Sequence, residues 1–320
     1  MQLLLVNNML VRTDIPKLLL AGMRKEFFKV YDSEIVAEWE RVATIIPSTK
    51  DKETYPWLGA VGKMKEWKDE RIPEGLLEHN FAVTNRDWEG SIAVDRNAIE
   101  DEQYGQINIR VRQLAQEAKR FIGELVFELL GQGNLSTGTS TNFSGKTITC
   151  YDGNPFFYGT HSEGSSGSQS NKGTVAFSFA NLQTAITAMK GIKDDKGKFL
   201  SVTPDLLVVN QSDEFLARET LNSTYYPVEG TTTNKLAVNV MKGIVDLYVT
   251  PYITSGTWIL LDTKGIVKPA ILQMRKKIDF TSLLTGQESF LRKKLYFGAD
   301  GRWEAAFGMW QYAYGANSGW

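Results

Sequence analysis

Cys150, Asp152 and His161 are the residues whose types and spacing come closest to a nucleophilic centre. A cysteine becomes a strong nucleophile when a histidine takes its proton and a carboxylate orients that histidine. Here the three residues lie in a segment rich in glycine and serine, with no strained turn predicted to hold them. We therefore interpret them as loop residues, and an enzyme that acts through Cys150 stays as an alternative hypothesis.

Other side chains that bind metals or move protons are sparse, with two histidines and one cysteine in 320 residues. His79 follows Glu78, but a zinc site would need further histidine or cysteine ligands. The neighbouring acids that remain are Asp69/Glu70, Asp101/Glu102 and Asp213/Glu214. Two of these pairs fall at predicted helix starts, where acids favour the helix dipole. The sequence therefore predicts no catalytic residue, no metal site and no cofactor.

The stretch YPWLGAVGKMKEW, residues 55–67, combines aromatic residues, glycines and lysines. Its GAVGK portion, residues 59–63, lacks the spacing of a phosphate-binding loop. Aromatic and basic residues together also occur where nucleic acids bind. The chain as a whole has 36 basic and 37 acidic residues, a net charge of −1, whereas a dedicated DNA-binding domain is usually basic. Short basic runs at 275–277 and 292–294 fit solvated strand ends or ion pairs better.

Composition and length set further bounds. Apolar residues make up 42% and charged residues 23%, which is typical of a globular protein with a sizeable core. A single cysteine excludes a disulfide within the chain and favours folding in a cytosol. The N-terminal residues lack the pattern of a signal peptide, and no apolar run approaches the ~20 residues of a membrane span. We therefore expect no membrane partner.

Apolar periodicity predicts an α+β chain. The predicted helices span 14–41, 97–131, 179–190 and 212–221. Asp14 and Ser212 are the expected N-caps of the first and last of these. The predicted strands span 205–209, 244–249, 258–262, 266–274 and 301–315. Pro269 lies inside one of them, which suggests an edge or a bulge there.

Two segments do not fit a compact core. Residues 42–94 are charged and rich in glycine between strand-like runs, so they predict a long two-stranded excursion, with a turn at the NRD of residues 85–87. Residues 131–173 are dominated by glycine, serine and threonine, which is typical of a flexible or partly disordered loop. Aromatic residues in 148–161 predict that part of this loop is anchored. Aromatic side chains in extended segments favour subunit interfaces, and hence an assembly protein.

Several stretches resemble the Mu-like major head subunits of tailed phages and prophages. They are residues 55–107, YDGNPFF with the following His161 (151–161), PDLLVVNQSDEFLARETLNSTYYP (204–227), GIVDLYVTPYI (243–253), 258–282, and KKLYFGADGRWEAAFGMWQYAYG (293–315). They follow one another in the family's order over most of the chain. Ser162 departs from the family pattern, in which a proline is expected after His161.

The resemblance implies the tailed-phage, Hong Kong 97-type major capsid fold, an α+β fold with an N-arm, an extended loop, a spine helix, and peripheral and axial domains. It implies an N-terminal arm at 1–45 and an extended loop at 46–94. The peripheral domain would span 95–179, with the spine helix at 106–131 and the Gly/Ser-rich insertion at 131–173. The axial domain would span 180–257, and residues 258–320 would supply late strands that return to the peripheral domain.

The resemblance also implies a function: a structural head protein, not an enzyme, that self-assembles as pentamers and hexamers into an icosahedral shell around double-stranded DNA. Its implied partners are other copies of itself, a scaffold or protease during assembly, a portal at one vertex, and packaged DNA contacted non-specifically. It would be made in the host bacterial cytoplasm and reside in the virion. The alternative is a shell protein of the same fold that encloses protein cargo in a nanocompartment.

On this reading the extended loop contacts a neighbouring subunit. The residues expected to make that contact are Tyr55, Trp57, Lys63, Lys65, Trp67, Lys68, Asp69, Glu70 and Arg71. The aromatic side chains would supply contact area, and the charged ones would pair across the joint.

Overall fold

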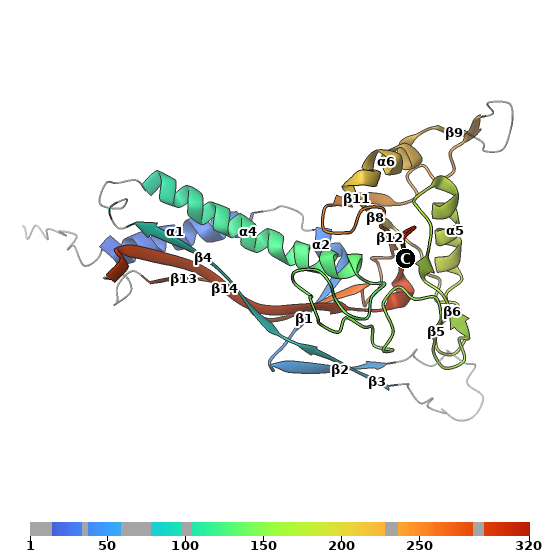
Figure 1. The fold of residues 1–320 in the computed structure, drawn as a ribbon, viewed down its shortest axis with the longest axis horizontal. Coiled ribbons are helices and arrows are strands. Elements are labelled where there is room, and N and C mark those ends of the chain that lie inside the picture. Colours follow the sequence, from blue (N-terminus) through green and yellow to red (C-terminus); the bar gives the residue numbers. More distant parts are fainter. Residues whose placement is uncertain are drawn as a thin grey trace, which may run out of the picture. The chain divides into compact units, whose positions relative to one another are not determined.

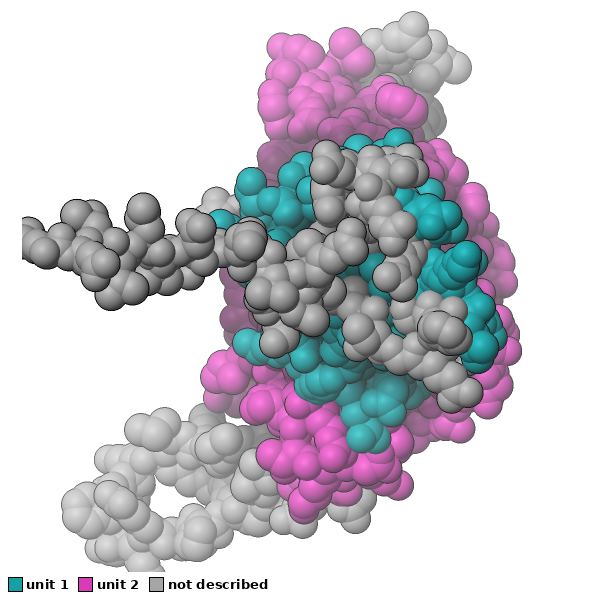
Figure 2. All heavy atoms as spheres, turned by 90° about the vertical axis from the view of Figure 1, so that its left-hand side faces the viewer, with its two compact units in different colours: residues 1–36, 86–122, 276–303 teal, residues 37–85, 123–275, 304–320 magenta. Residues whose placement is uncertain are grey.

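The computed structural model describes residues 15–33, 38–58, 78–95, 97, 104–227, 236–283 and 291–320. The chain forms two units, each assembled from separated stretches of sequence (Figure 2). Unit 1 takes residues 1–36, 86–122 and 276–303, and unit 2 takes 37–85, 123–275 and 304–320. Three long elements, α4 (Tyr104–Gly131), β13 (Ala270–Leu283) and β14 (Lys294–Phe307), run from one unit into the other.

Helix α1 (Ile15–Tyr31) is shorter than the helix predicted over 14–41. It ends because the Ser33 hydroxyl donates to the Val30 carbonyl at 2.6 Å, which occupies one of the free carbonyls of the last turn. A separate short helix, α2 (Glu38–Val42), follows. The predicted N-cap, Asp14, lies outside the described residues.

The core of unit 1 forms where helices pack on one face of a sheet (Figure 1). Helix α4 confirms the main part of the helix predicted at 97–131, and its stripe buries Ile107 and Val111. These side chains meet Phe27 of α1 and Phe297 of β14. Strand β4 (Arg86–Asp95) pairs antiparallel with β14, in register from Arg86 opposite Trp303 to Asp95 opposite Lys294.

The two-stranded excursion predicted from the sequence is present as a hairpin. Strand β2 (Lys52–Leu58) pairs antiparallel with β3 (Glu78–Thr84), in register from Lys52 opposite Thr84 to Leu58 opposite Glu78. The residues between the strands, 59–77, lie outside the described part of the chain.

The prediction of a turn at residues 85–87 was wrong. Asn85 is the single residue between β3 and β4, and Arg86 and Asp87 already belong to β4. The Asn85 side chain is buried and donates to the Ser48 hydroxyl at 2.9 Å and to the Lys50 carbonyl at 2.8 Å. Asn85 therefore holds this part of the backbone against residues 48–50 by hydrogen bonds and does not form a turn that reverses the chain direction.

Strand β1 (Ala43–Pro47) pairs parallel with the start of β13. Pro269 was predicted inside a strand at 266–274, but β13 begins one residue after it. The Pro269 carbonyl instead accepts a hydrogen bond from the Gly308 amide at 2.8 Å. Proline has no backbone N–H group to donate to a neighbouring strand, so Pro269 lies before the strand and not within it.

Unit 2 is built on a five-stranded sheet in the order β11-β8-β12-β15-β7. Its strands are β7 (Lys172–Gly173), β8 (Leu206–Asn210), β11 (Asp246–Thr250), β12 (Trp258–Leu261) and β15 (Ala313–Ala316). β11 and β8 are parallel, as are β15 and β7, whereas β12 is antiparallel to both of its neighbours. The strands predicted at 205–209, 244–249 and 258–262 are confirmed with ends shifted by one or two residues.

Helices α5 (Phe179–Lys190) and α6 (Glu214–Asn222) contribute to the core against this sheet. α5 has the predicted bounds, and the Ser178 side chain caps it by accepting from the Asn181 amide. The prediction of Ser212 as N-cap of α6 was wrong, because Ser212 lies inside a 3-10 turn, η1 (Gln211–Asp213). The Asn210 side chain caps that turn, and α6 begins after it.

The single strand predicted at 301–315 is interrupted. β14 ends at Phe307, a 3-10 turn η2 (Trp310–Tyr312) follows, and β15 continues. Gly308 makes the break possible, since a Cβ there would lie 2.1 Å from the Lys268 carbonyl oxygen. Phe307 before the break and Trp310 after it are both buried.

The Gly/Ser-rich segment is held more firmly than its composition predicts. Short strands β5 (His161–Ser162) and β6 (Ser168–Gln169) pair within it. The Phe157 ring is fully buried, and a Cβ at Gly133 or at Gly315 would lie 2.6 Å from it. Glycine at these positions makes room for an aromatic ring, in addition to allowing the backbone more conformations.

Strands β9 (Tyr225–Pro227) and β10 (Leu236–Val238) form a further two-stranded sheet in unit 2.

Candidate functional site

Cys150 is not placed as a nucleophile. Its thiol is buried, with Sγ 3.5 Å from the Gly308 carbonyl oxygen. Burial, together with the nearby charge of Asp152, raises the pKa of the Cys150 thiol well above its usual value. Since the thiolate is the reactive form, this cysteine stays protonated and unreactive. The structure therefore gives no support to an enzyme that acts through Cys150.

Asp152 and His161, predicted as unremarkable loop residues, form a buried pair. His161 Nδ1 lies 2.6 Å from Asp152 Oδ2, and His161 Nε2 lies 3.3 Å from the Phe156 carbonyl oxygen. The His161 ring stacks on Trp310 with a centroid separation of 4.1 Å. Burial alone would raise the pKa of Asp152, but the hydrogen bond and charge of His161 outweigh it and lower that pKa.

Hydrogen bonds extend this pair into a network with the C-terminal turn η2. Glu163 accepts from the Tyr151 hydroxyl at 2.5 Å and from the Trp310 indole nitrogen at 2.8 Å. Gln311 Nε2 donates to the Tyr151 hydroxyl oxygen at 2.7 Å. Burial is the main cause that raises the pKa of Tyr151, so its hydroxyl remains a donor. The network fastens the Gly/Ser-rich segment to the end of the chain and exposes no reactive group.

Sequence reasoning missed this network because its members are distant in sequence. Asn171 is part of the same region and is fully buried. Its amide nitrogen donates to the carbonyls of Phe156 at 2.8 Å and Trp310 at 3.2 Å, and its oxygen accepts from the Tyr158 amide at 2.9 Å. The aromatic residues around 148–161 were the only signal of it in the sequence.

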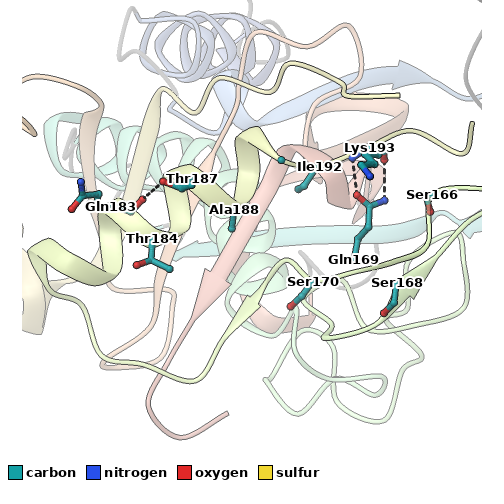
Figure 3. A pocket seen from close by; sticks show the side chains of 11 residues that line it. Ser166, Ser168, Gln169, Ser170, Gln183, Thr184, Thr187, Ala188, Ile192 and Lys193 are labelled. Atoms are coloured by element: carbon teal, nitrogen blue, oxygen red, sulfur yellow. Dashed lines mark hydrogen bonds between the residues drawn. The ribbon is translucent and has the colours of Figure 1, made fainter. Parts of the chain in front are cut away.

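A groove in unit 2 with a volume of about 730 Å³ lies between α5 and the β5–β6 hairpin (Figure 3). Gln169 lines it, accepting from the Lys193 amide at 2.6 Å and donating to the Lys193 carbonyl at 3.0 Å. The Thr187 hydroxyl donates back to the Gln183 carbonyl of its own helix at 2.9 Å. Serine and threonine hydroxyls and Lys193 line this groove, whereas no acid, histidine or cysteine does, so it lacks the histidine or carboxylate that usually activates a hydroxyl nucleophile.

Metal binding has no support in the described residues, where no three side chains of His, Cys, Asp or Glu gather. Of the acidic pairs, Asp213/Glu214 lies at the start of α6, and Glu214 pairs with Arg218 at 2.8 Å. The other two pairs lie outside the described part of the chain. Likewise, none of the described helices combines the length and the apolar character that a membrane crossing requires.

The predicted contact residues of the extended loop divide into two groups. Tyr55 and Trp57 lie in β2, where Trp57 is opposite His79 in the backbone ladder. The Tyr55 hydroxyl donates to Gln273 Oε1 at 2.6 Å, and burial raises its pKa to about 12. Tyr55 is therefore partly engaged within its own subunit. The remaining residues lie outside the described part: Lys63, Lys65, Trp67, Lys68, Asp69, Glu70 and Arg71.

Unit 2 exposes large apolar side chains that nothing in the described subunit covers. In β10 and just after it, Leu236, Val238 and Val240 are 66%, 70% and 67% exposed. At the start of α6, Phe215 is 81% exposed. We call Leu236, Val238 and Val240, which follow one another at every second residue, the apolar patch. Apolar side chains gathered on a surface mark contacts with other molecules, whereas isolated ones do not.

Comparison with known proteins gives these features a context. The family model of the Mu-like prophage major head subunit gpT matches residues 17–177, 174–253 and 254–319. The Mu-like prophage FluMu major head subunit of Haemophilus influenzae is 22% identical over 306 residues, which are 95% of this chain and 73% of that protein. The major capsid protein of Escherichia phage Mu is 27% identical over 145 residues, which are 45% of this chain and 43% of that protein.

Among solved structures, the procapsid of bacteriophage JBD30 is similar in fold, with a TM-score of 0.54 and 23% identity over 94% of this chain and 75% of that chain. Fold and family together define a class: a structural protein of a tailed-phage head with the Hong Kong 97-type major capsid fold. Within that class, the chain belongs to the Mu-like prophage major head subunit family. The predicted fold, family and structural role are thus confirmed.

Proposed function

We propose that this chain is the repeating subunit of an icosahedral head and assembles as pentamers and hexamers around double-stranded DNA. Its membership in a head-subunit family supports this function. The observation in the structure that carries it is the apolar patch, because a chain that worked alone would leave Leu236 and Val238 in water. In a ring of identical subunits, such a patch is covered by a different surface of the next copy.

We further propose the domain assignment that the family implies. Residues 1–45 serve as the N-terminal arm, 46–94 as the extended loop, 95–179 as the peripheral domain, 180–257 as the axial domain, and 258–320 as the returning strands. Supporting it are the hairpin β2–β3, the length of α4, and the location of the apolar patch within 180–257.

The extended loop contacts the neighbouring subunit through Trp57 and the charged residues between Lys63 and Arg71. Truncation of aromatic residues at the centre of an interface often costs about 2 kcal/mol or more. Trp57→Ala is therefore expected to weaken assembly more than it lowers the free energy of unfolding of the free subunit. Equal losses in the two measurements would place Trp57 in the subunit core.

Assembly with other proteins follows from the same function. A scaffold or protease acts during shell formation, a portal occupies one vertex, and the inner surface meets DNA without reading its sequence. The balanced net charge of −1 supports a non-specific contact with DNA rather than a dedicated binding domain.

Electron microscopy of the co-expressed head proteins tests the proposal, with closed shells of regular size as the expected result. A protein that stays monomeric at high concentration, with and without a scaffold, would contradict it. Analysis of what the purified shells contain distinguishes the two hypotheses. DNA inside them supports a phage head, and one specific enzyme inside them supports a protein-filled nanocompartment.

A further inference from the structure

Positive charge is concentrated in the helices of unit 1. Residues 15–33 and 104–122, which contain α1 and the part of α4 that belongs to this unit, carry eight basic and three acidic residues. The rest of the chain carries 28 basic and 34 acidic residues, so it is acidic. The net charge of −1 over the whole chain therefore conceals a local basic region.

On α1 this charge faces away from the core of unit 1. Met23 and Phe27 are buried in that core, whereas Lys25 and Lys29 are exposed. Two residues along a helix correspond to a rotation of about 200°, so the two lysines lie on the opposite side of α1 from the core residues. Lys25 and Lys29 are one turn apart, about 6 Å along the helix axis. The helix, which packs on one face of the sheet (Figure 1), thus presents two neighbouring cations on its outer side.

Glu26, which lies between these lysines in the sequence, does not neutralise them. Its carboxylate accepts from Arg112 Nε at 2.9 Å and from Arg112 Nη2 at 2.6 Å. The pKa of Glu26 is lowered, mainly by this hydrogen bond with Arg112 and further by the charges of Lys29 and Lys25. Neither lysine forms an ion pair within the described part of the chain. Three cations thus share one carboxylate, which leaves an excess of positive charge at this surface.

The two lysines border a shallow hollow of about 530 Å³ along α1. Three basic residues, one acid, one alanine and one aromatic residue line it: Ala21, Arg24, Lys25, Phe28, Lys29 and Asp32. The Phe28 ring meets Phe27 edge to face at a centroid separation of 5.3 Å, and Arg24 Cζ lies 5.4 Å from the centroid of the same ring. Phe28 is therefore engaged within the subunit and is not a free platform on which an unpaired base could stack.

A surface with lysines but no free aromatic ring fits a duplex better than a single strand. Duplex DNA carries one phosphate for about every 1.7 Å of its axis, and a lysine that neutralises a phosphate releases a bound counterion. Single strands rely in addition on bases that stack on aromatic side chains. Contacts with phosphates give affinity without sequence preference. The chemistry of this face therefore suits the sugar–phosphate backbone of double-stranded DNA.

We propose that the subunit has a nucleic-acid-binding activity of its own: before assembly it binds the phosphate backbone of duplex DNA through Lys25 and Lys29 of α1. The binding is independent of DNA sequence and weakens steeply with salt. This inference goes beyond the proposed function, because a closed shell can contain DNA for which its free subunits have no affinity.

Titration of a labelled DNA duplex with the unassembled full-length subunit, followed by fluorescence anisotropy at several salt concentrations, tests the activity. Two duplexes of unrelated sequence should bind equally. Each phosphate contact contributes a slope of about −0.9 to the plot of log K against log salt, which amounts to about 30-fold in affinity between about 1 M and 20 mM salt. Lys29→Gln is therefore expected to weaken binding about 30-fold at about 20 mM salt, and Lys25→Gln/Lys29→Gln to reduce the slope by about 1.8.

The matched control, Lys190→Gln/Lys198→Gln, removes the same charge from two exposed positions of unit 2. Lys190 lies in the last turn of α5, as Lys29 does in α1, so the two double variants also change the helix dipole alike. The control should keep the native salt slope. Lys25→Arg/Lys29→Arg should keep it as well, because a guanidinium also binds phosphate. All of these side chains are exposed, so the thermal unfolding midpoint of each variant should match that of the native subunit.

Three results would overturn the inference. The native subunit might not bind the duplex at all, or Lys25→Gln/Lys29→Gln could bind it with the native salt slope. Binding of the native subunit to poly-glutamate but not to DNA would assign this face to an acidic polypeptide instead. None of these results bears on the proposed function, which is judged separately by whether the native chain forms shells that contain DNA.

Discussion

Replacement of Asn171 by alanine removes the connection that holds the Gly/Ser-rich segment to the C-terminal turn. The side chain is fully buried and makes three hydrogen bonds, at 2.8, 2.9 and 3.2 Å. A hydrogen bond contributes about 1 kcal/mol net, and each partner left unsatisfied in a buried site adds to the loss. Asn171→Ala is therefore expected to lower the free energy of unfolding by about 3 kcal/mol or somewhat more.

Thermal unfolding of the unassembled subunit measures this loss. A change of 1 kcal/mol shifts the melting temperature of a domain of this size by about 2–4 °C, so a fall of about 6–12 °C is expected. Asn171→Asp should lose at least as much at neutral pH, because its carboxylate would face the carbonyl oxygens of Phe156 and Trp310 without a proton to donate.

The control is Ser170→Ala, one residue away and exposed, which should stay within about 0.5 kcal/mol of the native protein. A melting temperature for Asn171→Ala within about 2 °C of the native value would refute the reasoning, since it would mean that the three hydrogen bonds do not hold the segment.

The remaining predictions concern reactivity, pH and assembly. Cys150 should react with a thiol reagent only as fast as the subunit unfolds, and rapid labelling of the native protein would contradict the burial and the raised pKa of its thiol. The folded-state pKa of Asp152 is lowered, so its contribution to stability is present above the unfolded pKa of about 4 and is lost as pH falls through the folded value. The stability difference between the native chain and Asp152→Asn, measured in urea, should therefore narrow from pH 6 to pH 3. Val238→Asp should leave subunit unfolding within about 0.5 kcal/mol of native, because the residue is exposed, and yet prevent shell formation in sedimentation.

The regular elements were predictable wherever one apolar stripe decided the local structure. Helix α5 and the long helix α4 follow directly from the spacing of their buried residues. The hairpin β2–β3 was predictable because its charged, glycine-rich surroundings exclude a core location. In each case the signal lies within a short stretch of sequence.

Features fixed by distant contacts were not predictable from local pattern. Asn85 looked like a turn residue, but its side chain is bound by Ser48 and the Lys50 carbonyl, so the chain continues extended into β4. Glycine in 131–173 indicated flexibility, whereas Gly133 makes room for the Phe157 ring.

The central claim is that this subunit builds a closed shell through surfaces that it leaves uncovered when alone. Cryo-electron microscopy of the assembled protein tests it most directly. The account predicts an icosahedral shell in which the apolar patch, Leu236, Val238 and Val240, is buried against a neighbouring copy. A shell in which these side chains remain in solvent, or a protein that never leaves the monomeric state, would contradict it.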